Sequence, residues 1–260
     1  MKFMSYLLGA TGAVALAMAA SATARSAETK PGTYRGPAVA LGKGKAYAWV
    51  SIGEDGAPKQ LGVSLSEKVM NGIERLPDQS LTLALPAAAK RTGFDHVYLN
   101  WNRHGHPPEP IYGAPHFDVH FYWVSEAARR SVDPKDGHYL AKAQRHPPAE
   151  FVPKDYVPPP QPEPVPRMGV HWADVTSPEF NGRPFTYTFI YGGWDGQFTF
   201  VEPMIAKAFL ESRTSVSAPV KQPARFAKPG YYPTSYRIDF DPGTREHRVV
   251  LERLTKAHSH

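Results

Sequence analysis

Three side chains that bind metals or transfer protons occupy every second position of one short segment. His116, Asp118 and His120 alternate with large apolar residues in the segment 115–123, Pro-His-Phe-Asp-Val-His-Phe-Tyr-Trp. Because successive side chains of a β-strand point to opposite faces, this pattern predicts a strand with one apolar face in a core and one polar face. Imidazoles and carboxylates are ligands of divalent transition metals, so we expect the polar face to form the floor of a metal site.

The two histidines lie too far apart on a regular strand to hold one ion together. At about 3.3 Å per residue, the Cα atoms of His116 and His120 are about 13 Å apart, whereas an imidazole nitrogen must come within about 2 Å of a metal. Either the strand is bulged here, as strands beside functional sites often are, or Asp118 shares an ion with only one of the two histidines. Asp118 could also orient a histidine instead of binding the metal.

Further ligands must come from other segments. His171 follows a glycine at the start of the segment 168–174, and Glu202 ends a strand whose apolar row, Phe198 and Phe200, it continues. A carboxylate in such a row is costly unless it is paired or bound to a metal. In the loop 103–110, prolines fix the backbone that carries His106 and Glu109, which are candidates of a second rank. The predicted ligands of the divalent metal, for which zinc is our first choice, are His106, His116, Asp118, His120, His171 and Glu202.

Other chemistries have less support. The sequence contains no Gly-x-Ser-x-Gly elbow, no glycine-rich phosphate loop and no cysteine. A glycosidase using Asp118 and Glu202 has no support from their spacing. Three functions stay open. The protein is an oligomeric metal-binding protein, a metal-dependent enzyme that acts on a small molecule in the manner of cupins, or a structural envelope-stress protein without a metal. An open coordination position walled by Trp123 or Trp172 would favour the enzyme.

The N-terminal residues predict export. Lys2 precedes an apolar run from about residue 6 to residue 20, and Ala22-Thr23-Ala24 fits a cleavage site, so we interpret 1–24 as a signal peptide. The run is too short and too rich in alanine to span a membrane. We therefore expect a periplasmic or secreted protein with no membrane span after signal removal. Residues 25–44 are expected to form a flexible arm, and 45–255 a single domain.

Composition narrows the possible partners. The chain has 30 Lys and Arg against 24 Asp and Glu, a net charge of +6, and the basic residues are dispersed in pairs. This distribution argues against a nucleic-acid partner. No cysteine is present, so no disulfide stabilises the fold. A mature chain of roughly 235 residues is long enough to bury a core without one.

The remaining pattern predicts an α+β fold of mainly antiparallel sheet, barrel- or sandwich-like, with two or three short helices. A capping-box spacing from Ser64 to Glu67 predicts a helix over 64–76. Glycines at 192–196 predict a hairpin loop, and Pro203 is expected to end the strand that follows it. A stretch with nine prolines, 147–166, predicts an extended surface connection. The other expected strands are 45–52, 60–63, 80–85, 94–102, 185–191, 197–202, 236–240 and 247–251, and the other expected helices are 125–131 and 204–212.

Several strings of the sequence resemble one family. They are Trp101-Asn102, Gly105-His106-Pro107-Pro108, Ile111-Tyr112, Pro115 to Tyr122, Met168 to Trp172, Thr188 to Gly192 and Glu202 to Ile205. Together they resemble a family of exported bacterial proteins of unknown function, typified by a protein under sigma-E/anti-sigma-E control, over about residues 45 to 255. The resemblance implies a homo-oligomer with no assigned reaction. The matched motifs imply functional importance for six residues: His106, His116, Asp118, His120, His171 and Glu202.

Overall fold

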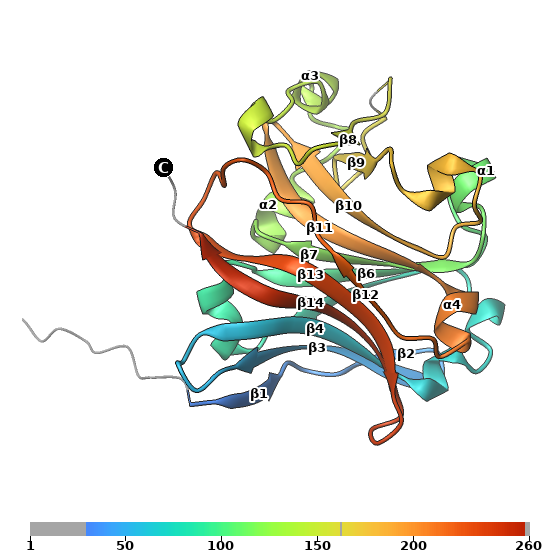
Figure 1. The fold of residues 1–260 in the computed structure, drawn as a ribbon. Helices are drawn as coiled ribbons and strands as arrows, with labels where there is room; N and C mark the ends of the chain where they lie inside the picture. Colours follow the sequence, from blue (N-terminus) through green and yellow to red (C-terminus); the bar gives the residue numbers. More distant parts are fainter. Residues whose placement is uncertain (1–29, 162, 258–260) are drawn as a thin grey trace, which may run out of the picture.

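Two antiparallel sheets packed face to face form the molecule. The computed structural model describes residues 30–161 and 163–257, so the predicted signal peptide, 1–24, lies outside the described residues. Each sheet has seven strands in these ranges, which confirms the expected α+β class and makes the fold sandwich-like. Figure 1 shows the two sheets stacked, with α1 and α3 beyond the upper sheet.

The lower sheet, called sheet A, has the order β1-β3-β4-β14-β13-β12, with β2 also paired to β3. Its strands are β1 (Gly32–Arg35), β2 (Val39–Leu41), β3 (Gly44–Ile52), β4 (Pro58–Ser66), β12 (Val216–Pro219), β13 (Gly230–Asp241) and β14 (Glu246–Ala257). The predicted closing hairpin at 236–251 is present and longer than expected, because β13 and β14 pair from Gly230↔Ala257 to Asp241↔Glu246.

The upper sheet, called sheet B, has the order β5-β6-β7-β11-β10-β9-β8. Its strands are β5 (Gln79–Ala84), β6 (His96–Asn102), β7 (His116–Tyr122), β8 (Tyr156–Val157), β9 (Val170–Asp174), β10 (Tyr187–Trp194) and β11 (Gln197–Ala206). The predicted His/Asp strand is β7, and it lies at the centre of this sheet between β6 and β11. Its apolar residues Phe117, Val119 and Phe121 are fully buried in the core between the sheets, as the alternation predicts.

Short helices connect the strands. They are α1 (Glu109–Tyr112), α2 (Glu126–Arg130), α3 (Tyr139–Ala143) and α4 (Lys207–Glu211), with 3₁₀ turns η1 (Glu67–Met70), η2 (Ile73–Arg75), η3 (Ala87–Thr92), η4 (Ala149–Phe151) and η5 (Pro178–Asn181). None of the helices in 30–161 and 163–257 combines the length and the apolar character that crossing a membrane requires.

The outer face of sheet B is covered at two places by apolar side chains. One cluster contains Tyr112 of α1 with Phe185, Ile190, Met204 and Ala206. The other contains Tyr98, Tyr122 and Phe200, with Met168 packed against them. The polar residues of β7 lie on this same outer face, and their burial therefore comes from the segments that cross it.

The expected flexible arm, 25–44, is wrong over most of the part that the structure describes. β1 and β2 pair with β3, with Gly32 opposite Ile52 and Leu41 opposite Gly44. This polar segment has too few apolar residues to fold on its own, and its backbone hydrogen bonds to β3 hold it in place. Residues 25–29 lie outside the described ranges.

The expected helix over 64–76 is also wrong. β4 continues through Ser66, and the two 3₁₀ turns η1 and η2 follow. Ser64 accepts a hydrogen bond from the indole of Trp49, and the carboxylate of Glu67 pairs with Arg213 and Arg245. Both residues of the supposed capping box therefore have tertiary partners, and these replace the local cap.

Two expectations about the β10–β11 hairpin need correction. Gly192 and Gly193 belong to β10, and the turn is made by Asp195 and Gly196 at positive φ. β11 runs through Pro203 to Ala206, so the expected helix from 204 shortens to α4. Pairing with β7 lapses at Glu202 and at Pro203, which has no N–H to donate, while pairing with β10 continues there.

The proline-rich connection, 147–166, is only partly extended. It contains η4 and the two-residue edge strand β8, which pairs with β9. The buried Tyr156 donates a hydrogen bond from its hydroxyl to the backbone carbonyl of Phe189 at 2.7 Å. This stretch is therefore attached to sheet B.

Candidate metal centre

β7 is a regular strand without a bulge. Its pairing with β6 runs unbroken from His96↔Tyr122 to Asn102↔His116. The alternative in which a bulge brings His116 and His120 to one ion is therefore wrong. On a regular strand these two imidazoles serve different sites.

The six predicted ligand residues form two groups of three. The first triad is His106, His116 and Asp118, and the second triad is His120, His171 and Glu202. Within each triad, the atoms that could bind a metal all lie within 4.8 Å of one another. Asp118 thus joins His116, while His120 joins Glu202 from the neighbouring strand.

The first triad is centred on the Asp118 carboxylate. His116 Nε2 lies 3.1 Å from Asp118 Oδ1, and His106 Nε2 lies 3.5 Å from Asp118 Oδ2. Asn102 Nδ2 donates a hydrogen bond of 2.6 Å to Oδ2 from the position on β6 that lies opposite His116. Asn102 was not among the predicted site residues, although its place on the polar side of its strand is visible in the alternation of 96–102.

A glycine allows the loop before β7 to deliver His106. Gly105 has a φ of +69°, and a Cβ there would lie 2.0 Å from the carbonyl oxygen of Tyr112. This close approach lets the backbone N–H of His106 donate to that carbonyl at 3.1 Å. The loop therefore closes on α1 and brings the His106 ring within 4.7 Å of the His116 ring, measured between centroids.

The second triad combines three strands. The register between β11 and β7 sets Glu202 across from His120. His171 lies on β9, two strands from Glu202, and has Gly192 of β10 opposite it. The two Nε2 atoms, of His120 and His171, lie 3.4 Å from Glu202 Oε1 and Oε2, respectively.

Phe200 supports both imidazoles of the second triad. Its ring lies over Gly192, where an added Cβ would come within 2.0 Å of the ring carbons. The ring centroids of His120 and His171 are 4.9 and 5.5 Å from that of Phe200. A β-bulge between Phe198 and Phe200 turns these two residues to opposite faces of sheet B, so only Phe200 shares a face with Glu202. The expected row of Phe198, Phe200 and Glu202 is correct only for its last two members.

Backbone carbonyls orient three of the four imidazoles. His106, His116 and His120 place Nδ1 at 2.9, 2.7 and 3.0 Å from the carbonyl oxygens of Pro107, Ala114 and Tyr98. A carbonyl only accepts, so Nδ1 carries the hydrogen, and the Nε2 of a neutral ring keeps a lone pair. This is the arrangement that metal-binding histidines adopt, with the distal nitrogen free for the ion.

The lone pairs of both triads face carboxylate oxygens. Four atoms are buried and have no hydrogen-bond partner in the described part of the chain: His116 Nε2, Asp118 Oδ1, His120 Nε2 and Glu202 Oε2. Leaving one buried polar atom unsatisfied costs about 1–3 kcal/mol. Buried acceptors that face one another, such as His116 Nε2 and Asp118 Oδ1 at 3.1 Å, need a proton or a metal cation between them.

Burial shifts the protonation of the second triad. It lowers the pKa of His120 to about 4 and that of His171 to about 3, so both rings are neutral at pH 7. Burial also raises the pKa of Glu202 well above its usual value, and the charge of Asp118 adds to this. Burial therefore favours the protonated form of Glu202, and a metal in the second triad would compete with that proton.

In the first triad, neighbouring groups shift the pKa values more strongly than burial does. Burial raises the pKa of Asp118, but the adjacent imidazoles of His106 and His116 lower it by more, and the pKa lies below the ordinary range. For His106, burial favours the neutral ring, yet the carboxylate beside it holds the pKa above 6.5. Asp118 is thus an ionised carboxylate inside the protein, which is the form that binds metals.

Each triad has one solvent-facing member. The side chains of His106 and His171 are 36% and 26% exposed, whereas those of His116 and His120 are fully buried. An ion can therefore reach either triad from the His106 and His171 side. Three protein ligands also leave at least one coordination position for water or a substrate.

The structure does not bring every candidate to this place. Glu109 lies exposed at the start of α1 and belongs to neither triad. Trp123 and Trp172 pack with the core between the sheets, on the other side of sheet B, so neither walls an open coordination position. Gly192 and Phe200 were missed as supporting residues, because their role depends on which strands are neighbours.

Comparison of the chain with protein-family models, with curated proteins and with solved structures finds no match. The resemblance to the exported family typified by a protein under sigma-E/anti-sigma-E control stays a prediction.

Proposed function

We propose that this protein binds two divalent transition-metal ions, one in each triad on the outer face of sheet B. The observation that supports the proposal is the set of buried, unpartnered Nε2 and carboxylate oxygen atoms that face one another in both triads. Bound ions would satisfy these atoms and neutralise the carboxylates of Asp118 and Glu202.

The donor set favours zinc. Each triad offers two imidazoles and one carboxylate, a combination used by zinc sites that keep a fourth position open. The same combination also suits iron, manganese, nickel and copper, whose preferences differ in geometry more than in ligand type. Zinc is our first choice because it accepts three protein ligands and a water in a tetrahedral arrangement.

Elemental analysis of protein purified from its native compartment tests the proposal. We expect two equivalents of metal per chain in the wild type and one in each of the variants His116→Ala and His171→Ala. The matched control is His138→Ala, which removes an imidazole that is 77% exposed and outside both triads. Absence of stoichiometric metal from the wild type, also after dialysis against zinc, would refute the proposal.

A catalytic role is a second candidate. The partial exposure of His106 and His171 supports it, because it leaves a solvent-facing side on which a small molecule could reach a metal-bound water. A zinc ion held by either triad would lower the pKa of a bound water towards 7 and would thereby supply a nucleophile. Zinc-dependent hydrolysis of activated esters, lost in His171→Ala and kept in His138→Ala, would favour an enzyme; its absence would favour metal binding alone.

We also propose that the protein is exported and forms homo-oligomers, with no nucleic-acid partner. The apolar N-terminal run and the Ala-Thr-Ala string support export, and the family resemblance supports assembly. Fractionation of cells and light scattering of the purified protein test these two statements separately. A monomer with a full complement of metal would contradict the oligomer and leave the metal sites intact. An oligomer without metal would support the structural, envelope-stress alternative.

A further inference from the structure

A second potential ligand site lies on the other side of sheet B. It is a pocket of about 250 Å³ at the edge of the sandwich. Its walls come from η3 and Gly93, from Trp123 directly after β7, from residues 147–151, from the β10–β11 hairpin, and from the loop between β12 and β13. Of these residues, Tyr191, Phe198 and Trp123 pack with the core between the sheets, whereas both triads lie on the outer face.

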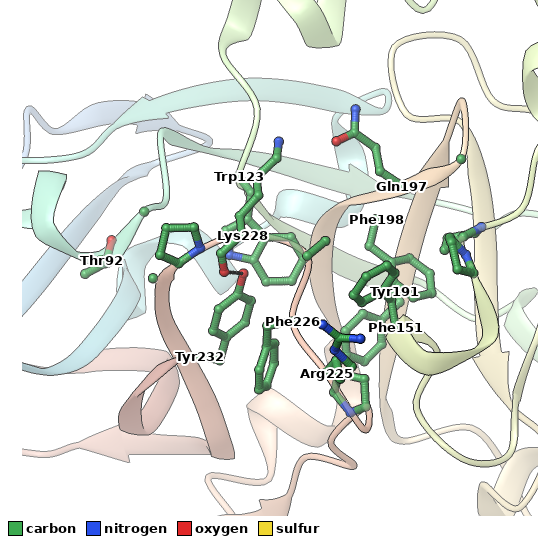
Figure 2. A pocket seen from close by; sticks show the side chains of 18 residues that line it. Thr92, Trp123, Phe151, Tyr191, Gln197, Phe198, Arg225, Phe226, Lys228 and Tyr232 are labelled. Carbon is green, nitrogen blue, oxygen red and sulfur yellow. Dashed lines mark hydrogen bonds between the residues drawn. The ribbon is translucent and has the colours of Figure 1, made fainter. Parts of the chain in front are cut away.

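Aromatic side chains dominate the pocket. They are Trp123, Phe151, Tyr191, Phe198, Phe226 and Tyr232. Figure 2 shows Tyr232 and Phe226 on one side of the pocket, with Tyr191, Phe198 and Phe151 on the other. Phe226 stacks on Tyr232 with 3.9 Å between ring centroids, and Trp123 lies 5.5 Å from the same tyrosine ring. A planar ring placed between the two sides would continue this row of aromatic contacts.

The polar groups of the pocket favour an anion. Arg225 and Lys228 line it, and its wall contains no carboxylate. Neither cation forms an ion pair with a carboxylate in residues 30–161 or 163–257. The indole Nε1 of Trp123 is a buried donor that lacks an acceptor in the same ranges. A ligand with one anionic oxygen-bearing group would complement both cations and supply hydrogen-bond acceptors.

The loop that carries the two cations is held in place. The backbone N–H of Arg225 donates to the carbonyl of Glu150 at 2.9 Å, and the hydroxyl of Tyr232 donates to the carbonyl of Lys228 at 2.8 Å. These bonds tie the loop to residues 147–151 and to β13, so the pocket is formed before a ligand arrives. A preformed site loses less entropy on binding.

We propose that this pocket binds an aromatic carboxylate of one or two fused rings. Its volume limits the ligand to this size, since pockets for drug-sized molecules begin at about 300 Å³. The ring lies between Phe226 and Tyr191, and the carboxylate meets Arg225 and Lys228. The site goes beyond the proposed metal binding and does not depend on it.

Calorimetric titration with 2-naphthoate tests the proposal on the full mature protein. We expect saturable binding of one equivalent, and an affinity about fivefold lower in the double variant Arg225→Gln/Lys228→Gln. The matched control is Lys135→Gln/Arg183→Gln, which removes the same charge at exposed positions outside the pocket and should leave the affinity unchanged. Absence of saturation up to millimolar 2-naphthoate would overturn the proposal.

Two further ligands separate the roles of charge and ring. The neutral 2-naphthylmethanol should bind more weakly than 2-naphthoate and should not respond to Arg225→Gln/Lys228→Gln. Phe226→Ala, checked for folding by circular dichroism, should weaken both naphthalene ligands. Equal affinity for the acid and the alcohol would refute the recognition of a carboxylate. Tighter binding of decanoate than of 2-naphthoate would refute the recognition of an aromatic ring.

Discussion

His116 Nε2 lies 3.1 Å from Asp118 Oδ1, and neither atom has a hydrogen-bond partner within the described residues. The other ring nitrogen of His116 faces the carbonyl of Ala114, so the hydrogen of a neutral ring is on the far side. Two acceptors held together in a buried position are stable only with a proton or a metal cation between them.

Removing one carboxylate should remove one ion only. We expect Asp118→Asn to bind one equivalent of zinc in the second triad, and Glu202→Gln to bind one in the first, because each carboxylate belongs to a single triad. Isothermal titration calorimetry of the metal-free proteins with zinc measures this. Loss of both ions in either single variant would show that the six residues form one joint site, and the double variant should bind none.

The same two variants should differ in stability when no metal is present. Burial raises the pKa of Glu202 and favours its neutral carboxyl form, so a neutral amide should replace it with little change in the free energy of unfolding. Asp118 is ionised and accepts a hydrogen bond from Asn102, so Asp118→Asn should lower the free energy of unfolding by about 1–3 kcal/mol. Urea denaturation in the presence of a chelator compares them. A larger loss in Glu202→Gln than in Asp118→Asn would contradict these protonation states.

Metal should stabilise the native state against heat. A ligand that binds only the native state at 100 times its Kd adds about 2.7 kcal/mol. For a chain of this size, one such ion corresponds to a rise in Tm of about 5–10 °C. Differential scanning calorimetry with and without zinc measures the rise, and a chelator should reverse it. In His116→Ala the rise should be about half that of the wild type, and no rise in the wild type would contradict tight binding.

The alternation in 116–122 was enough to predict both faces of β7, because the period of a strand is a local property. The sequence also placed the six candidate ligands on this face or near it. It could not assign them to two triads, since that division depends on Glu202 lying across from His120 and on His171 reaching past Gly192. Both are relations between strands, which the chain does not encode locally.

The errors have a similar origin. The spacing from Ser64 to Glu67 suits a helix cap, but Trp49 and Arg245 supply tertiary partners that local propensity ignores. Pro203 was expected to end its strand, yet β11 tolerates it where pairing with β7 lapses. In each case, contacts distant in sequence override the local preference.

Acidification should destabilise the metal-free protein between pH 6.5 and 4. Burial lowers the pKa of His120 to about 4 and of His171 to about 3, so the unfolded chain binds more protons than the native state below pH 6.5. Stability therefore rises with pH in this window and is lost as pH falls. For His120 the drop is on the order of 3 kcal/mol, at 1.36 kcal/mol per unit. Glu202, whose pKa is raised, has the opposite slope above pH 4.5 but offsets only one of the two histidines.

Urea denaturation from pH 7.5 to 4 measures this dependence. His120→Gln removes one of the two titrating groups, so its free energy of unfolding should fall less steeply with acidification than that of the wild type. His138→Ala, at an exposed position, is the control and should follow the wild-type curve. Identical slopes in His120→Gln and the wild type would show that His120 is not buried in its neutral form.

Gly192→Ala should impair the second triad and spare the first. The added methyl group would lie 2.0 Å from carbons of the Phe200 ring, so the ring must move away from His120 and His171, which it supports. Overpacking of this kind costs about 1–3 kcal/mol of stability. We expect zinc titration to show an unchanged first site and a second site weakened at least about tenfold, equivalent to 1.4 kcal/mol. Gly137→Ala is the matched control, because nothing lies within 4 Å of its added Cβ. Equal weakening of both sites would mean that Gly192 supports sheet B as a whole, since a local effect on the His171 side cannot reach Asp118.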